Sequence, residues 1–229
     1  MAHPRFGDIA ACVFDAYGTL FDYNAAAARH AAALGDKAAP LAELWRHKQL
    51  QYTWLRSLMG RYTGFWQVTG DALDFSMGEL GIEDDALRAD LMEAYRTLDA
   101  YPEVTETLTT LRAHGLRTAI LSNGEPEMLE AAVAAAGIGD SLDAVLSVEE
   151  VGIFKPHPSV YQLVVDRLGV PAAKVSFQSS NAWDANGAAA FGFRVAWCNR
   201  FGQGQERIPE APDAEIKTLA ELPPLLGIV

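Results

Sequence analysis

Short apolar or β-branched runs alternate with helical patterns through most of this chain, and this order constrains the fold more than any other feature. Runs with strand character lie at 11–15, 117–123, 142–147, 174–180 and 194–199, and the segments at 107–115, 126–137, 158–169 and 183–192 have helical spacing. Strands and helices alternating in this way indicate a parallel sheet with crossover helices. We therefore expect an α/β fold with a Rossmann-like parallel sheet.

The alternation stops between Phe21 and Tyr101, where the chain shows helical patterns without strand patterns. A block of this kind, placed between the first strand and the rest of a sheet, is typical of an inserted domain. We predict an α/β core formed by residues 1–21 and 101–229 and a helical cap formed by residues 22–100.

One cap helix, expected within 40–60, carries apolar residues on two faces. One stripe has helical spacing and consists of Leu41, Leu44, Trp45, Tyr52, Leu55 and Met59. A second set recurs every four residues and consists of Arg46, Leu50 and Trp54. A helix that is apolar on two sides is expected to be covered on both, so the face with Arg46 is expected to look down onto the sheet. Spacing alone also fits an Arg46 that lies along the helix flank with its charge in water.

The charge balance argues against two classes of partner. The 229 residues include 30 acidic and 18 basic side chains, which give a net charge of -12 and a pI near 4.8. We therefore expect no nucleic-acid-binding surface and no binding to anionic membranes. Cys12 and Cys198 lie in apolar, strand-like runs and are expected to be buried thiols. Because no apolar run is long enough to span a membrane and the first ten residues lack the apolar core of a signal peptide, we expect a cytoplasmic protein.

Polar side chains lie at the ends of several predicted strands and in the loops beside them. Ligands of open α/β sheets bind at the carboxyl ends of the strands. The residues found there are Asp15, Ser122, Asn123, Lys155, Ser179, Ser180, Asn181 and Asp184. Each of them alone, like Thr19 close by, has a structural explanation as a turn, capping or first-turn helix residue. A lysine beside two acids at the ends of neighbouring strands, however, indicates a catalytic or binding site.

Several motifs together carry a family resemblance. They are FDAYGTLFD at 14–22, LSNG at 121–124, KPHPSVY at 155–161, SSNAWD at 179–184 and, in the cap, WRHKQLQYTWLRSLMGRYTGFW at 45–66. With these motifs the chain resembles the haloacid dehalogenase superfamily and, within it, the L-2-haloacid dehalogenases, over nearly its whole length. The resemblance implies hydrolysis of the carbon–halide bond of a small 2-haloacid, with release of halide, through an ester on an aspartate. It implies no cofactor and, together with the aromatic-rich cap, a homodimer.

The resemblance also implies roles for individual residues. Asp15 is expected to be the nucleophile, and Arg46 with Asn123 to receive the halide. Ser122 with its backbone amide, helped by Lys155, is expected to hold the substrate carboxylate. Asp184 is expected to position or activate water. The residues expected to orient Asp15 and Lys155 are Thr19, Tyr161, Ser179 and Asn181. The residues expected to form an apolar lining around the carbon chain of the substrate are Tyr17, Leu50, Phe65 and Trp183.

Two positions depart from the family pattern. Residue 47 is histidine where an amide such as glutamine is expected, and residue 125 is glutamate in a loop that often carries a small residue there. These departures bear on pocket size and substrate range, not on the reaction. His47 fits a pocket role and a surface role equally well.

The residue at position 17 bears on the type of reaction. Phosphatases of this superfamily place a second acid two residues after the nucleophile, where it protonates an alkoxide leaving group. Here that position is Tyr17, a poor proton donor at neutral pH, whereas a halide leaves without a proton. A phosphatase metal ligand is likewise replaced by Ser180, and Lys155 brings a positive charge to the site, so we expect no metal.

Two alternatives stay open at this point. The first is a Mg²⁺-dependent phosphatase of the same fold that acts on a small phosphorylated acid. The second is a non-catalytic binding protein, because a fold does not fix a function. A binding protein would have no need for the full set of Asp15, Arg46, Ser122, Lys155, Asn181 and Asp184.

Overall fold

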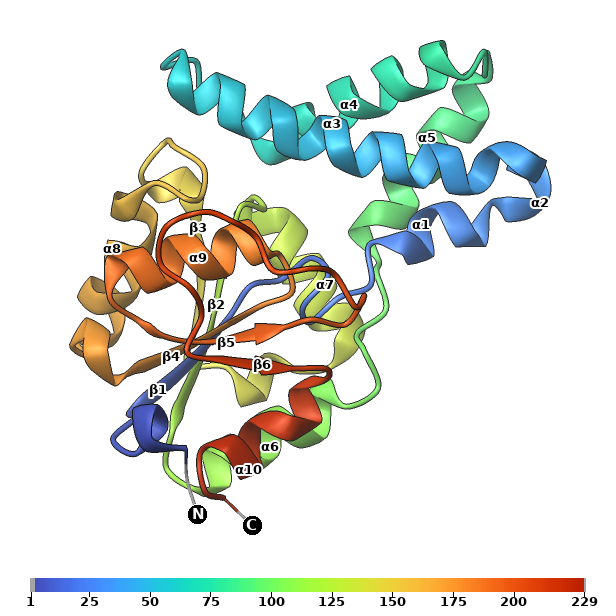
Figure 1. The fold of residues 1–229 in the computed structure, drawn as a ribbon. Coiled ribbons are helices and arrows are strands. Elements are labelled where there is room, and N and C mark those ends of the chain that lie inside the picture. Colours follow the sequence, from blue (N-terminus) through green and yellow to red (C-terminus); the bar gives the residue numbers. More distant parts are fainter. Residues whose placement is uncertain (1–2, 229) are drawn as a thin grey trace.

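The computed structural model describes residues 3–228 and contains a six-stranded, fully parallel sheet (Figure 1). Its strands are β1 (Ala11–Phe14), β2 (Arg117–Ser122), β3 (Ala144–Ser147), β4 (Val175–Ser179), β5 (Arg194–Cys198) and β6 (Ala214–Ile216), in the order β3-β2-β1-β4-β5-β6. The expected α/β fold is confirmed, and the five predicted strands are present. The sequence patterns missed β6, which is only three residues long and too short to show alternation.

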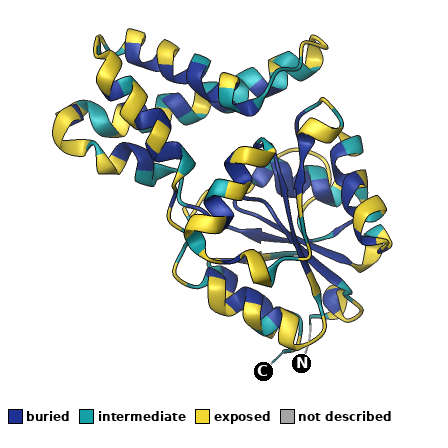
Figure 2. Ribbon diagram, turned by 180° about the vertical axis from the view of Figure 1, so that it is seen from behind, coloured by how far each residue is buried: buried dark blue, intermediate teal, exposed yellow. Residues whose placement is uncertain are grey.

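The strand β1 lies between β2 and β4, and its register brings the strand ends together. Phe14 lies opposite Ile120 of β2 and Gln178 of β4. The next residue, Asp15, still donates its backbone N–H to the Gln178 carbonyl across 2.9 Å. All residues of β1 are buried, as Figure 2 shows for most of the sheet. A continuous apolar strand of this kind is expected in a parallel sheet that is covered on both faces.

Helices cover both faces of this sheet. The core helices are α6 (Val104–Ala113), α7 (Pro126–Ala136), α8 (Pro158–Leu168), α9 (Ala182–Phe191) and α10 (Leu222–Leu225). The helices α6 and α10 pack together on one face, and α8 and α9 pack together on the other (Figure 1). Short 3₁₀ turns occur at Pro4–Phe6, Gly35–Lys37, Gly139–Ser141, Val148–Glu150, Ala172–Lys174 and Leu219–Glu221.

A second group of helices stands above the carboxyl edge of the sheet (Figure 1). It comprises α1 (Asn24–Arg29), α2 (Ala31–Leu34), α3 (Ala38–Leu58), α4 (Phe65–Glu79) and α5 (Asp85–Arg96), and we call it the cap. The two chain segments that connect it to the core run side by side, because Asp22 N donates to Asp99 O and Tyr101 N donates to Leu20 O, both at 2.9 Å. The division into domains at residues 22 and 100 stays a prediction.

The buried stripe of α3 differs from the predicted one. Its buried residues are Leu41, Trp45, Gln49 and Thr53, one every four positions. The predicted stripe was wrong at its carboxyl end, where Leu55 and Met59 are 44% and 63% exposed. The predicted stripe contained apolar residues only and therefore left out the two buried polar side chains, Gln49 and Thr53.

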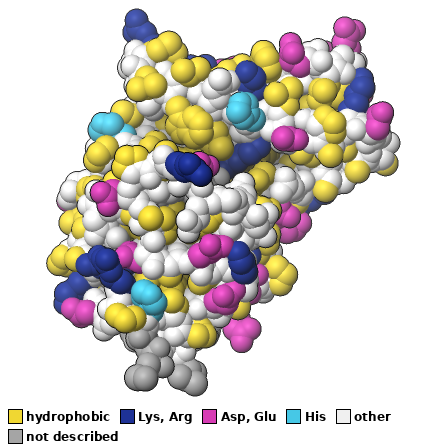
Figure 3. Space-filling model, viewed as in Figure 1, with side chains coloured by type: hydrophobic (Ala, Val, Ile, Leu, Met, Phe, Trp, Pro, Cys, Tyr) yellow, Lys and Arg dark blue, Asp and Glu magenta, His cyan; other side chains and the backbone are white. Residues whose placement is uncertain are grey.

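The remaining sequence expectations concern thiols, membranes and charge. Cys12 and Cys198 are free and buried, as expected, and burial raises the pKa of the Cys198 thiol to about 11. Within residues 3–228 no helix is long and apolar enough to cross a membrane. On the face drawn in Figure 3, basic side chains are interspersed with acidic ones.

Candidate active site

The carboxylate of Asp15 is held by four donors from three separate segments of the chain. Lys155 Nζ lies 3.0 Å from Oδ1. Oδ2 accepts hydrogen bonds from Asn181 Nδ2 at 2.8 Å, Ser179 Oγ at 3.3 Å and Thr19 Oγ1 at 3.4 Å. Asp15 follows β1 directly and is 6% exposed. Donors of this kind fix the orientation of the carboxylate.

The loop after Asp15 is shaped by Gly18. Its φ of 88° lies in the left-handed region, and a Cβ there would lie 2.8 Å from Ser180 Oγ and 2.9 Å from the Tyr23 ring. Glycine permits this close approach. The turn places Thr19, whose hydroxyl oxygen accepts the backbone N–H of Ser180 at 2.8 Å. This bond connects the loop after β1 to the loop after β4.

Lys155 lies between two carboxylates. Its Nζ is 3.0 Å from Asp15 Oδ1 and 2.8 Å from Asp184 Oδ2, and the side chain is 1% exposed. Burial opposes the charged form of Lys155, but the two carboxylates outweigh it and hold its pKa above the ordinary value. The ammonium therefore stays charged at neutral pH.

Asp184 lies in the first turn of α9, fully buried. Burial raises its pKa, Lys155 opposes this shift, and the charge of Asp15 adds to it. Tyr161 donates its hydroxyl to Asp184 Oδ1 at 2.8 Å. The expected role of Tyr161 in orienting Asp15 and Lys155 stays a prediction, because its hydroxyl contacts Asp184, which in turn binds Lys155. Gly187 makes room for this contact, since a Cβ there would lie 2.7 Å from the Tyr161 hydroxyl.

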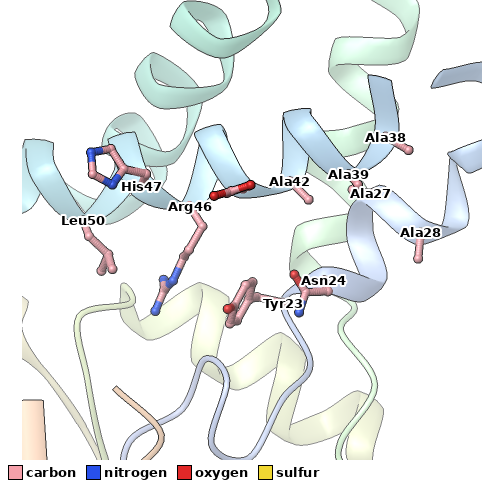
Figure 4. A pocket seen from close by; sticks show the side chains of 11 residues that line it. Tyr23, Asn24, Ala27, Ala28, Ala38, Ala39, Ala42, Arg46, His47 and Leu50 are labelled. Atoms are coloured by element: carbon pink, nitrogen blue, oxygen red, sulfur yellow. The ribbon is translucent and has the colours of Figure 1, made fainter. Parts of the chain in front are cut away.

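Arg46 reaches the site from α3 of the cap. Figure 4 shows Arg46 and Leu50 pointing from α3 towards the core, with Tyr23 beside the guanidinium. Arg46 Nη2 donates to Asn181 Oδ1 at 3.1 Å, and its Cζ lies 4.7 Å from the centre of the Tyr23 ring. The face of α3 that carries Arg46 and Leu50 therefore looks onto the core, as predicted. A cavity of about 630 Å³ adjoins these side chains and runs between α1 and α3.

The four residues of the expected apolar lining come from cap and core. Tyr17 stacks on Phe65 with 5.8 Å between the ring centres. Trp183 meets Trp54 of α3 edge to face at 5.3 Å, and Leu50 borders the cavity. Within residues 3–228 the buried Tyr17 hydroxyl has no hydrogen-bond partner. Burial raises the pKa of Tyr17 well above its usual value, so this phenol keeps its proton.

Ser122 and Asn123 lie in the loop after β2, next to the site. Ser122 is fully buried, and its hydroxyl oxygen accepts the Gly124 N–H at 3.0 Å. Asn123 Oδ1 accepts the backbone N–H of Lys155 at 3.0 Å, a contact that the sequence did not predict. The amide oxygen of Asn123 is thereby used, which leaves its NH₂ group as the donor for a ligand. The roles of Ser122 and Asn123 towards substrate stay predictions.

The two departures from the family pattern have different surroundings. His47 is exposed at the edge of the cavity and points away from Arg46 and Leu50 (Figure 4). Glu125 connects core and cap, because its Oε1 accepts the Trp66 N–H at 3.0 Å in the first turn of α4. A carboxylate at a helix N-terminus is favourable.

Two residues around Arg46 were not predicted from the sequence. Tyr23 contributes its ring face, and Gln49 accepts a hydrogen bond from Arg46 Nη1 at 2.8 Å. A polar residue at buried helical spacing was the available signal for Gln49.

The site can be compared with known proteins. Residues 9–192 match the family model of haloacid dehalogenase-like hydrolases. The chain is 49% identical over 219 residues to (S)-2-haloacid dehalogenase 1 of Pseudomonas sp. (strain CBS-3), which covers 95% of this chain and 96% of that protein. It is 46% identical over 218 residues to (S)-2-haloacid dehalogenase 4A of Burkholderia cepacia, with 95% and 94% covered. A solved structure of L-2-haloacid dehalogenase from Xanthobacter autotrophicus with chloropropionic acid covalently bound is similar at a TM-score of 0.89 and 43% identity, covering 96% of this chain and 98% of that one.

Proposed function

The chain belongs to the haloacid dehalogenase-like hydrolases, and on this basis we propose that it is an (S)-2-haloacid dehalogenase, which converts L-2-haloalkanoic acids to D-2-hydroxy acids. The observation that carries the proposal is the arrangement of charge around Asp15. Lys155 holds this carboxylate from one side, and Arg46 is joined to it through Asn181 from the other. Relatives named (S)-2-haloacid dehalogenase match nearly the whole chain.

In the first step of the proposed reaction, an Asp15 oxygen attacks C2 of the substrate and the halide leaves with the bonding electrons. An ester then joins Asp15 to the substrate. Arg46 faces the leaving halide and stabilises the charge that develops on it. The rings of Tyr17 and Phe65 exclude water from the nucleophile. The loop with Ser122 holds the substrate carboxylate and thereby fixes the angle of attack.

In the second step, water attacks the carboxyl carbon of Asp15. Asp184 accepts a proton from this water and returns it to the departing alkoxide, so that the hydroxy acid leaves with the oxygen that Asp15 supplied and the Asp15 carboxyl is restored. In the free enzyme the negative charge of Asp15 helps to raise the pKa of Asp184. Ester formation removes this charge. The ester therefore favours the ionised form of Asp184 at the moment when a base is needed.

The phosphatase alternative is less well supported. Tyr17, at the position of the second acid, is buried with its proton retained. The donor set also fits a metal ion poorly, because the Lys155 ammonium already lies between Asp15 and Asp184. Across residues 3–228 no three His, Cys, Asp or Glu side chains gather as metal ligands would. We therefore propose a reaction without a metal.

A homodimer in the cytoplasm is part of the same proposal. The cap exposes Leu55, Leu58, Met59 and Phe75 at the surface of α3 and α4. Exposed apolar side chains of this size support contact with another protein surface. Sedimentation equilibrium would test the dimer, and a mass equal to that of one chain would contradict it.

The function is tested by measuring halide release from the two enantiomers of 2-chloropropionate. The L enantiomer should release chloride and yield D-lactate, whereas the D enantiomer should release little. Hydrolysis of a generic phosphate ester, lost on chelation with EDTA and restored by Mg²⁺, would instead support the phosphatase. Absence of halide release from both enantiomers would contradict the proposal.

A further inference from the structure

Gln49 is a buried amide in the middle of the cap. It lies on α3 in the stripe that faces α4 and is 1% exposed. Burying an amide is costly unless its oxygen and nitrogen both find partners. A buried glutamine therefore either destabilises the fold or has hydrogen-bond partners for both its oxygen and its nitrogen.

The hydrogen bonds of Gln49 can run in one direction only. Arg46 Nη1, 2.8 Å from Gln49 Oε1, is a donor and cannot accept, so the amide oxygen must face it. Gln49 Nε2 donates to Thr69 Oγ1 at 2.8 Å, and this hydroxyl gives its own proton to the Phe65 carbonyl at 2.7 Å. Tyr95 completes the surroundings, with its hydroxyl 3.1 Å from Nε2. Both ends of the amide are thereby fixed.

The same network continues from Arg46 into the core. Arg46 Nη2 donates to Asn181 Oδ1 at 3.1 Å, and Asn181 Nδ2 donates to Asp15 Oδ2 at 2.8 Å. Asn181 therefore also has only one workable orientation. A continuous chain of hydrogen bonds thus connects α4 of the cap to the Asp15 carboxylate. Arg46 lies in the middle and donates in both directions.

We propose that Gln49 is a positioning residue that holds the Arg46 guanidinium where the halide departs, an inference that rests on the proposed function. A free arginine side chain samples many rotamers. Gln49 restricts this freedom before substrate binds, so that the positive charge is already in place when the carbon–halide bond breaks.

The test replaces Gln49 with methionine, which has a similar length and no hydrogen-bonding amide. Single-turnover halide release from L-2-chloropropionate should slow by at least about tenfold, with a smaller change in KM. The loss should be smaller with L-2-bromopropionate, because bromide is the better leaving group and needs less stabilisation. A purely structural role would not change with the halogen.

Thr53→Val is the matched control. Thr53 lies one turn further along the same buried stripe and donates to the Leu50 carbonyl at 2.7 Å. Its replacement should leave halide release unchanged. Thr69→Val, which keeps the shape of the side chain, provides a second variant of the network if Gln49→Met does not fold, and it should slow halide release about fivefold, as expected for one lost hydrogen bond.

A double-mutant cycle with Arg46→Ala decides whether Gln49 acts through Arg46. In the Arg46→Ala background, Gln49→Met and Thr69→Val should cause no further loss. Wild-type rates in the single variants Gln49→Met and Thr69→Val would overturn the inference. The same fold loss with and without Arg46 would also overturn it. Failure of the wild-type enzyme to release halide at all would instead overturn the proposed function.

Discussion

Arg46 of the cap donates a hydrogen bond to Asn181 of the core, with 3.1 Å between Nη2 and Oδ1. The cation thus reaches the carboxyl edge of the sheet only when α3 lies over it. Asn181 in turn donates a hydrogen bond from Nδ2 to Asp15 Oδ2 at 2.8 Å, so the position of α3 also affects the orientation of Asp15. The seating of the cap and the orientation of the nucleophile are therefore linked through one amide side chain.

Replacing Arg46 with alanine should slow dehalogenation by about 10²–10³-fold, the usual effect of removing a donor that stabilises developing negative charge. Stability should change little, because the guanidinium is only partly buried. Halide release and thermal unfolding would be measured together. Arg56→Ala is the control, since Arg56 lies on the same helix and pairs with Asp71 at 2.6 Å. A loss of less than about tenfold would make Arg46 an ordinary helix-flank residue.

The clustering of the site residues could be predicted because it follows from topology. In a parallel sheet the carboxyl ends of neighbouring strands meet at one edge, and the patterns located β1 and β4 correctly. The approach of Lys155 to Asp15 and Asp184 confirms that these groups converge. Their catalytic roles stay predictions that the experiments below address.

Contacts that depend on how the cap is seated could not be predicted. In the sequence, Gln49 is one polar residue among several on a helix. Its hydrogen bonds to Thr69 of α4 and to Arg46 depend on the packing of the cap. The link between Glu125 and the start of α4 joins residues 59 positions apart in the chain. The partner of Tyr161 depends on how closely α8 packs against α9, which no local pattern encodes.

Turnover of L-2-chloropropionate should persist after exhaustive chelation with EDTA. The physical reason is that the Lys155 ammonium supplies the positive charge between Asp15 and Asp184 that a metal would otherwise provide. Initial rates would be compared before chelation, after it, and after addition of Mg²⁺. Activity that disappears with EDTA and returns with Mg²⁺ would contradict the metal-free mechanism.

Replacing Lys155 with methionine should lower the free energy of unfolding at pH 7.5 by about 3–5 kcal/mol, because two buried carboxylates lose their counter-charge. In the wild type the pKa of Lys155 is raised, so its stabilising contribution is complete at neutral pH and is lost only as pH rises above 10.5. In the variant Asp184 loses the Lys155 contact that opposes the rise of its pKa, while burial still raises this pKa. The variant should therefore regain stability as pH falls towards 5.5.

Urea unfolding at both pH values measures this effect. Lys174→Met is the control, because Lys174 pairs with Asp8 at 3.0 Å on the surface, and it should change stability by no more than about 0.5 kcal/mol. A deficit of Lys155→Met that does not depend on pH would show that packing, and not charge, is the main contribution of Lys155.

The covalent step can be tested with isotope-labelled water. If Asp15 is the nucleophile, the hydroxyl oxygen of the product comes from its carboxylate, and the solvent oxygen enters Asp15 when the ester is hydrolysed. A single turnover in ¹⁸O-water with enzyme in excess should therefore label the peptide that contains Asp15 and leave the hydroxy acid largely unlabelled. A peptide from an Asp15→Asn variant treated in the same way should carry no label.

Stereochemistry tests the same mechanism independently. The only displacement at C2 is the attack by Asp15, because the second step occurs at the carboxyl carbon and breaks no bond at C2. One inversion must follow, so an L-2-haloacid should give the D-2-hydroxy acid. Direct attack by water activated at Asp184 would also invert C2, but it would place the ¹⁸O in the first-turnover product. Chiral analysis of the product and mass analysis of the peptide are thus needed together, and either retention at C2 or label in the product would exclude Asp15 as the nucleophile.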